Sequence, residues 1–321
     1  MTTQAEPSTA TSRIEKTINP DQPEARTMPA DMDFPTMESH VQDTFYLDRE
    51  DGRIAYDVIG QGPLVVLSPG LADTRISYRF LAPLIADAGY RVASVDLRGH
   101  GESSTGWDSY SRTDTAGDLV EVIRKLGGPA VIVGQSFSGG SAPIAAATSP
   151  DLVSAIVQID PGTRAPQFSL SALLRNSHNY RRGALLLGRF ILTGSVKTWS
   201  KYLDVAYPER KPADWDTWLA ALQANLREPG RVKAAQRMIK SRPADAAAQL
   251  ANVQCPALVV MGSDDPDFPD PEAEAAAIVG LLPHGLGRYE IIENAGHYPH
   301  AQYPQQVADV ILPFLAEHAN G

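Results

Sequence analysis

The chain lacks the features on which several classes of protein depend. Only one of its 321 residues is a cysteine, Cys255, so no intrachain disulfide can form and a cytoplasmic setting is favoured. No apolar stretch is long enough to span a bilayer, because the longest, residues 184–192, is interrupted by Arg189. We therefore predict no transmembrane segment, and we interpret this stretch as the interior of a helical region or as the interface of a homodimer.

Several ligand-binding motifs are also absent. Neither G-x-G-x-x-G nor G-x-x-x-x-G-K-[ST] follows a predicted strand, which disfavours a dehydrogenase, and we expect no cofactor. His297 and His300 are close in sequence, but no H-E-x-x-H spacing accompanies them, so we expect no metal site. The 38 acidic residues exceed the 28 basic ones, which argues against a nucleic-acid partner.

The first part of the chain, residues 1–40, is rich in Thr, Pro, Glu and Asp and has no apolar core of its own. A secretory signal would need a basic start followed by a continuous apolar stretch. We therefore predict a disordered N-terminal tail over these residues.

From residue 41 onward, short β-type runs alternate with longer helical ones. Such alternation predicts an α/β fold with a mostly parallel sheet and helices on both faces. Between residues 161 and 250 the alternation gives way to several helical segments. The sequence thus predicts a core formed by 41–160 and 251–321, interrupted by a helical cap at 161–250.

Charge divides at the same boundary. Residues 161–250 contain 15 Lys and Arg against 6 Asp and Glu, a net charge of +9, whereas the rest of the chain has a net charge of −19. A basic insertion could dock on the acidic core, recruit an anionic substrate or contact an anionic membrane surface. The alternative is that these charges occupy solvated helix faces, some of them paired with the core.

A serine in a tight turn is the first chemical signal. Ser136 follows the apolar run 130–133 and precedes an Ala-rich segment, with small neighbours at Gly134, Ser138 and Gly139. A sharp strand-to-helix turn of this kind exposes the serine hydroxyl above the sheet and directs the next backbone N–H to the same place. Ser136 is therefore a candidate nucleophile, although an incidental serine in a structural loop has the same local pattern.

A base and an acid are needed to activate such a serine. His297 follows the last predicted strand, in a loop where its side chain can reach over the sheet edge, and it is better placed than His100. His100 belongs to the Gly-rich loop 96–103, where Asp96, Arg98 and His100 suit a polar network that braces neighbouring loops.

The acid is open among three carboxylates. Asp265 is the first choice, because it follows the next-to-last predicted strand, and Asp264 is its adjacent competitor. Asp160 ends the strand before the insertion and is the other alternative. One carboxylate suffices to orient the imidazole and to stabilise the imidazolium that forms when histidine takes the serine proton.

The order Ser136, Asp265, His297, together with the loop 96–103, resembles the α/β-hydrolase superfamily. The resemblance covers about residues 46–315, with the helical insertion in the place of the family's variable cap. It implies Ser136 as nucleophile, His297 as base and Asp265 as acid. It also implies an oxyanion hole formed by the backbone N–H groups of Leu71 and Phe137.

Two positions depart from the family pattern. Ser138 stands where many members have Gly, and it is small enough to leave the turn intact. Ser68 stands where many members have His, which changes the support and shape of the pocket. The Gly-Gly-Gly oxyanion motif of one lipase group is absent, and this argues against that group.

The nucleophile favours one chemistry within the superfamily. Relatives that open epoxides or remove halide are expected to use aspartate at the elbow, and Ser136 therefore favours acyl transfer, with a small carboxylic ester or lactone as substrate. Alternatives within the fold are carbon–carbon bond hydrolysis, amide cleavage and cofactor-free perhydrolysis. A hypothesis of another class is a non-catalytic or slow-turnover ligand receptor.

Overall fold

The computed structural model describes residues 43–165, 178–241 and 243–319. The predicted tail at 1–40 lies outside these residues. Among the described residues, no helix combines the length and apolar character needed to cross a membrane.

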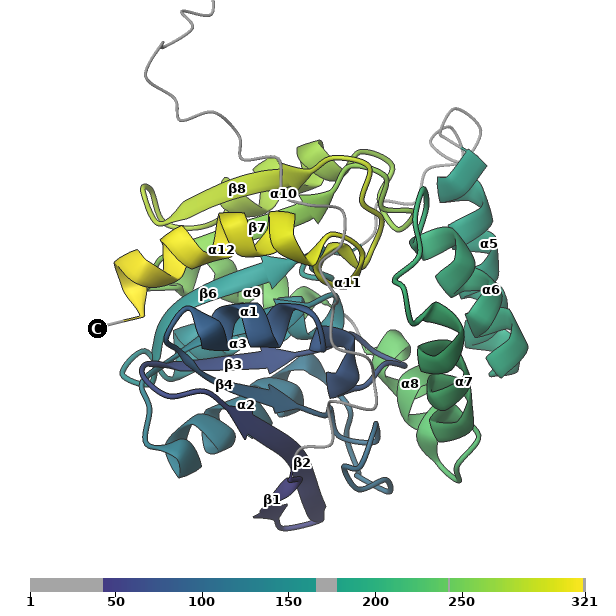
Figure 1. Cartoon of the computed structure of the whole chain (residues 1–321), viewed down its shortest axis with the longest axis horizontal. Helices are drawn as coiled ribbons and strands as arrows, with labels where there is room; N and C mark the ends of the chain where they lie inside the picture. Colours follow the sequence, from purple (N-terminus) through teal and green to yellow (C-terminus); the bar gives the residue numbers. More distant parts are fainter. Residues whose placement is uncertain (1–42, 166–177, 242, 320–321) are drawn as a thin grey trace, which may run out of the picture. The chain divides into compact units, whose positions relative to one another are not determined.

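One eight-stranded sheet organises the fold (Figure 1). Its strands, in chain order, are β1 Phe45–Arg49, β2 Gly52–Ile59, β3 Leu64–Ser68, β4 Arg91–Val95, β5 Ala130–Gln135, β6 Val153–Ile159, β7 Ala257–Gly262 and β8 Gly287–Ile292. The spatial order is β1-β2-β4-β3-β5-β6-β7-β8; β2 pairs antiparallel with β1 and β4, and all other neighbours are parallel. The predicted mostly parallel sheet is confirmed.

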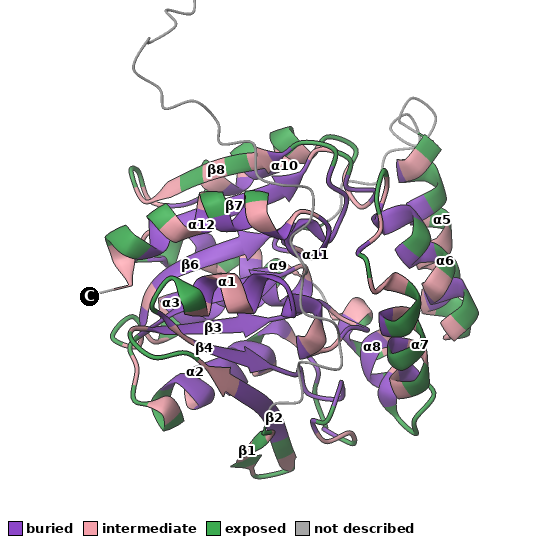
Figure 2. Ribbon diagram, viewed as in Figure 1, coloured by how far each residue is buried: buried purple, intermediate pink, exposed green. Residues whose placement is uncertain are grey.

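Strands β3, β5 and β7 are buried along their whole length, and buried residues dominate the interior of the sheet in Figure 2. Their sequences are continuous apolar runs rather than alternating ones, because both faces of a parallel sheet are covered by helices. Where the chain reaches the solvated edge, at β1, exposed and half-buried residues are mixed instead.

Helices cover both faces. On one face α1 (Leu81–Asp87) and α12 (Pro304–His318) share an apolar cluster with the sheet. On the other face a second cluster joins the sheet to α2 (Arg112–Leu126), α3 (Phe137–Thr148), α9 (Ala244–Gln249) and α10 (Pro271–Val279). The capping box at Ser111 and Asp114 fixes the start of α2, and left-handed Gly127 ends it.

Between β6 and β7 the chain forms a helical insertion, beyond the carboxyl ends of the parallel strands (Figure 1). Its helices are α5 (His178–Thr193), α6 (Val196–Ala206), α7 (Trp215–Leu226) and α8 (Arg231–Lys240). A third, aromatic-rich cluster packs them against the loops that follow β3 and β8. Helix α9 returns to the sheet, since Ala246 belongs to the core cluster.

The apolar stretch 184–192 forms part of α5. Phe190 is buried in the aromatic-rich cluster, whereas Leu185 and Leu192 are exposed. The stretch therefore contributes both to the interior of the insertion and to its surface.

Three short helical turns were not expected from the sequence. These are η2 (Arg75–Tyr78), η3 (Leu250–Asn252) and α11 (Pro299–Gln302). Each is too short to show an apolar periodicity, so pattern alone cannot distinguish it from a loop.

Candidate active site

Ser136 occupies a strained turn between β5 and α3. Its φ is 51° and its ψ is −110°, a conformation that non-glycine residues adopt only when the surroundings enforce it. The Ser136 N–H donates to Ile159 O at 2.8 Å, and its carbonyl accepts the N–H groups of Gly140 and Gly162. A Cβ at Gly134 would lie 2.5 Å from the Ser138 carbonyl oxygen, so the turn requires glycine there.

The loops after β7 and β8 bring a histidine and an aspartate together. His297 Nδ1 lies 2.8 Å from Asp265 Oδ2, and both side chains are buried. The histidine loop is fixed on two sides: the His297 N–H donates to Ala206 O in the insertion, and Gln135 Nε2 donates to the His297 carbonyl oxygen at 2.8 Å. This geometry holds the imidazole in one orientation.

The two other carboxylates that the sequence left open lie in different surroundings. Asp264 is exposed, and it is its neighbour Asp265 that contacts the imidazole. Asp160 is fully buried, and its Oδ1 accepts the Gly262 N–H at 2.9 Å. Burial, reinforced by the nearby Asp265 carboxylate, raises the pKa of Asp160 well above its ordinary value. The protonated, neutral form of Asp160 is therefore favoured.

A third carboxylate next to the imidazole, that of Asp267, was not predicted from the sequence. Asp267 Oδ2 lies 3.6 Å from His297 Nε2, and Asp267 Oδ1 accepts a hydrogen bond from Tyr202 Oη at 2.9 Å. Burial of its carboxylate raises the pKa of Asp267 to about 6. Asp267 is close to Asp265 in sequence, and this was the available hint of its role. Its hydrogen-bond partner Tyr202 comes from α6, more than sixty residues away along the chain, so the contact could not be predicted from the sequence.

These carboxylates dominate the protonation of His297. Burial alone would lower the pKa of His297, but the Asp265 and Asp267 carboxylates outweigh it and raise the pKa to about 10. The imidazolium is therefore the resting form near neutral pH, and the neutral form becomes more abundant as the pH increases.

The segment after β3 packs directly on the elbow. A Cβ built at Gly70 would lie 2.9 Å from Ser136 Cβ, so only glycine permits this approach. Leu71, the next residue, lines the same cavity as Ser136. Phe137 begins α3, where the first N–H groups of a helix have no acceptor within the helix.

The two positions that depart from the family pattern contact each other. Ser138 Oγ donates to Pro69 O at 2.6 Å and lies 2.8 Å from Ser68 Oγ, which therefore donates to it. Both serines are fully buried. A hydroxyl pair thus ties the elbow to the segment after β3, where the sequence alone indicated two separate substitutions.

A cavity of about 460 Å³ opens between the sheet and the insertion. Its lining includes Ser136, His297, Asp267 and Leu71 from the core and Tyr202 from the insertion. Parallel sheets commonly bind ligands beyond the carboxyl ends of their strands. The candidate nucleophile, the candidate base and one of the two oxyanion candidates therefore line one cavity.

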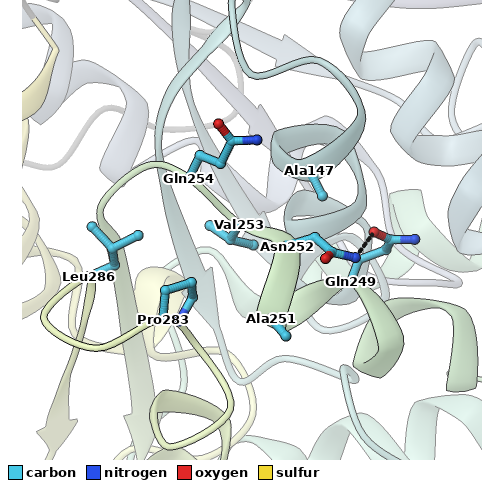
Figure 3. A pocket seen from close by; sticks show the side chains of 8 residues that line it. All are labelled: Ala147, Gln249, Ala251, Asn252, Val253, Gln254, Pro283 and Leu286. Atoms are coloured by element: carbon cyan, nitrogen blue, oxygen red, sulfur yellow. Dashed lines mark hydrogen bonds between the residues drawn. The ribbon is translucent and has the colours of Figure 1, made fainter.

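Figure 3 shows the side chains that line another hollow of the core. Its volume is about 700 Å³. It lies before β7 and β8, at the opposite end of the strands from Ser136. Its lining comprises Ala147, Gln249, Ala251, Asn252, Val253, Gln254, Pro283 and Leu286. None of these side chains is an acid, a base or a nucleophile, so the hollow has no means of performing acyl transfer.

The polar residues of the loop 96–103 make bracing contacts as expected, but they do not form one network. Asp96 accepts the N–H groups of Arg75 and Glu102, at 2.7 and 2.9 Å. Arg98 pairs with Asp118 in α2, and His100 Nδ1 contacts the Arg98 carbonyl oxygen at 3.0 Å. The loop is thus held to its neighbours by separate contacts rather than by one shared cluster.

One group of side chains has the composition of a metal site. The ligand atoms of Asp160, Asp265 and His297 lie within 4.8 Å of one another. His297 and Asp265 are already hydrogen-bonded to each other, as an acid–base pair requires. His300 is not part of the group, because its Nε2 lies 2.8 Å from Ser77 Oγ.

Comparison with known proteins gives a match to the alpha/beta hydrolase family over residues 65–310. The chain belongs to this family. It is 27% identical to 2-(acetamidomethylene)succinate hydrolase of Mesorhizobium japonicum, over 85% of this chain and 96% of that protein. Its structure is similar to that of a thermophilic esterase from Thermogutta terrifontis, with a TM-score of 0.67, 22% identity, and coverage of 86% and 98% of the two chains.

A further relative matches only in part. Bifunctional epoxide hydrolase 2 of Sus scrofa is 37% identical over 90 residues, which are 27% of this chain. The match spans only 16% of the length of that protein. This member of the alpha/beta hydrolase family therefore shares one segment with the epoxide hydrolase rather than its whole length.

Proposed function

We propose that this alpha/beta hydrolase is a serine hydrolase that cleaves a small carboxylic ester or lactone through an acyl-enzyme. One observation carries the proposal: the strained Ser136 and the Asp265-bound His297 line the same cavity. The family match and the hydrolase-named relatives support a hydrolytic enzyme.

In the proposed first step, Ser136 Oγ attacks the substrate carbonyl carbon while His297 Nε2 takes the hydroxyl proton. Asp265 keeps the Nδ1 proton in place and stabilises the imidazolium. The N–H groups of Leu71 and Phe137 would bind the developing oxyanion. Donors of this kind contribute roughly 3 to 4 kcal/mol each to the transition state.

The imidazolium then gives its proton to the leaving alkoxide. In the second half of the reaction, a water molecule hydrolyses the acyl-enzyme by the same path in reverse. The carboxylates around His297 favour this protonated form. The same carboxylates make the neutral base scarce at low pH. We therefore expect kcat/KM to increase from neutral toward alkaline pH.

The residue at the elbow separates this proposal from epoxide opening. Epoxide hydrolases of the superfamily are expected to carry aspartate there, whereas this chain has Ser136. Amide cleavage is the second candidate, because one relative, which matches 85% of the chain, is named for an acetamido-substituted succinate. Carbon–carbon bond hydrolysis, cofactor-free perhydrolysis and a slow-turnover receptor are the remaining alternatives.

Domain boundaries form part of the proposal. We assign residues 41–160 and 251–321 to the core and 161–250 to a cap, with one refinement. Helix α9 contributes to the same core cluster as α3, so we place the end of the cap before Ala244.

Turnover of p-nitrophenyl acetate and butyrate, followed by a screen over ester chain length and lactone ring size, tests the proposal. Ser136→Ala should lower kcat by about 10⁴-fold or more and abolish labelling by a fluorophosphonate. Ser149→Ala, at the other end of α3, is the matched control and should retain activity. Equal turnover by wild type and Ser136→Ala would refute the proposal.

A further inference from the structure

The cavity contains a buried cation to which the described residues offer no counter-ion. Arg112, the first residue of α2, lines the cavity and is 8% exposed. No carboxylate of the described residues lies within 4.0 Å of its guanidinium. Its Nη1 lies 3.5 Å from both the carbonyl and hydroxyl oxygens of Ser241, at the limit of hydrogen bonding, and its Nε has no partner among the described residues.

An isolated charge in such a place is unfavourable unless something pairs with it. Burial lowers the pKa of Arg112 to about 10, against the influence of Asp245, so the guanidinium stays charged near neutral pH. Asp245 is itself engaged, because it accepts a hydrogen bond from Thr113 Oγ1 at 3.0 Å. The positive charge is therefore available to a ligand.

A second arginine in the cavity provides the contrast. Arg164 Nη1 lies 2.8 Å from Glu274 Oε2, and both residues line the same cavity. Its charge is satisfied within the protein. The difference between the two arginines is thus the presence of a carboxylate partner, not their place in the cavity lining.

Arg112 lies beside the backbone of the elbow that carries Ser136. A Cβ built at Gly162 would lie 3.0 Å from Arg112 Nη2 and 3.6 Å from the Ser136 carbonyl oxygen, so a single glycine separates the two. The guanidinium carbon lies 4.4 Å from the centroid of the ring of Phe137, the residue that follows the proposed nucleophile. Because Arg112 and Ser136 also line the same cavity, one small molecule can contact both.

We propose that Arg112 binds a carboxylate of the substrate, which makes the substrate class esters or amides of acids that carry a second, anionic carboxylate. This inference rests on the proposed function of Ser136. A guanidinium matches a carboxylate through two parallel N–H···O bonds, which a neutral acyl chain cannot form.

The charges elsewhere favour a singly charged group. Asp265 and Asp267 lie beside His297 and would repel a dianion such as a phosphate monoester more strongly than a carboxylate. The insertion, with 15 basic and 6 acidic residues over 161–250, would attract an anion of either charge, so the preference for a monoanion comes from the two aspartates.

Matched substrates test the proposal: 4-nitrophenyl hydrogen succinate, which is anionic, and its methyl ester, which is neutral, each corrected for spontaneous hydrolysis. Arg112→Met should lower kcat/KM for the anionic ester by about 10- to 100-fold, the range for one charge-assisted hydrogen bond, and change the neutral ester by less than about threefold. Arg112→Lys should recover part of the loss. Arg124→Met, which removes an exposed charge from the same helix, should change neither substrate. An equal loss on both esters would overturn the proposal.

A binding measurement that needs no turnover separates this proposal from that of Ser136. Succinate titrated calorimetrically into the wild type and Ser136→Ala should bind both and should not bind Arg112→Met. If neither ester is turned over but this pattern holds, the Ser136 chemistry fails and the carboxylate site stands. If succinate binds Arg112→Met as it binds the wild type, or does not saturate the wild type in the millimolar range, the carboxylate site is refuted, whatever the turnover.

Thermal unfolding distinguishes a binding role from a structural one. Because Arg112 lacks a counter-ion among the described residues, Arg112→Met should keep or raise the Tm. A marked fall in Tm together with equal losses on both esters would show that Arg112 serves packing instead.

Discussion

Around His297 three carboxyl groups surround one imidazole, whereas elsewhere in the cavity lining one of two guanidinium groups has a carboxylate partner and the other has none. The first set, the acidic group, consists of His297 with Asp160, Asp265 and Asp267. The second set, the basic group, consists of Arg112 together with the Arg164–Glu274 pair. The acidic group has an internal cation to neutralise it in part, while the basic group keeps one charge unpaired.

The difference indicates how each group responds to a ligand. In the acidic group, the protein's own side chains determine the protonation of His297, so changes there should appear in the pH dependence and in kcat. In the basic group, we expect a carboxylate of the substrate to be the missing counter-ion of Arg112. Changes there should therefore alter substrate preference. Mutations can test whether the two groups behave separately.

The largest expected effect is in the acidic group. Asp265→Asn should lower kcat by about 10⁴-fold, because the amide no longer holds the imidazole tautomer or stabilises the imidazolium. Asp160→Asn should lower it by less than about tenfold, because burial already raises the pKa of Asp160 and favours its neutral form. Steady-state kinetics on p-nitrophenyl butyrate provide the measurement, and the reverse ranking would transfer the role of the acid to Asp160.

The next effect concerns the pH profile. Asp267 is one of the carboxylates that raise the pKa of His297, so its removal should lower that pKa and make the neutral base available at lower pH. In Asp267→Asn, the rising limb of kcat/KM should therefore move to lower pH. A limb displaced by one pH unit corresponds to about tenfold more activity at a fixed pH on that limb. Tyr202→Phe, which keeps the carboxylate and removes its hydrogen-bond donor, is the comparison variant. An unmoved limb would mean that Asp267 does not influence the base.

A smaller effect tests the basic group. Glu274→Gln should free Arg164 from its partner and improve kcat/KM for an anionic ester by about threefold, while a neutral ester remains unchanged. Glu272→Gln, on the same helix but outside the cavity lining, is the matched control. Should Glu274→Gln raise the rates on both esters equally, the increase would not come from the charge of Arg164.

The smallest effect tests the hydroxyl pair beneath the elbow, which belongs to neither group. Removal of either hydroxyl of the Ser68–Ser138 pair should lower the free energy of unfolding by about 1 kcal/mol, because the partner loses a buried hydrogen bond. The double variant Ser68→Ala/Ser138→Ala should cost less than the sum of the single variants. Urea unfolding of the wild type, the two single variants and the double variant completes a double-mutant cycle. Strict additivity of the free-energy changes would mean that the two serines act independently.

The fold class and family could be predicted from the sequence because the strand and helix patterns continue along most of the chain. Buried parallel strands appear as uninterrupted apolar runs, as in Leu64–Leu67, and helical periods recur between them. The elbow at Ser136 was visible because small residues must surround it. The assignment of catalytic roles stays a prediction, as do the homodimer and the cytoplasmic setting.

Other parts of the site depend on contacts that no local pattern records. Asp267 could not be ranked above Asp264 from sequence, because only the folded chain places it beside Tyr202 and His297. The unpaired state of Arg112 was equally invisible, since the sequence does not say which carboxylates lie within reach of a cation. Burial and pairing are properties of the tertiary structure, and the electrostatics of a site follow from them.

The hydrogen bond from the His297 N–H to Ala206 O has a consequence for engineering. A Cβ at Gly296 would lie 2.2 Å from the same carbonyl oxygen, so the end of α6 and the histidine loop fit closely together. The helical insertion is therefore not a module that can be exchanged freely for that of a relative. A chimaera would have to keep the backbone around Ala206, or it would change the reactivity of the histidine along with the selectivity of the cavity.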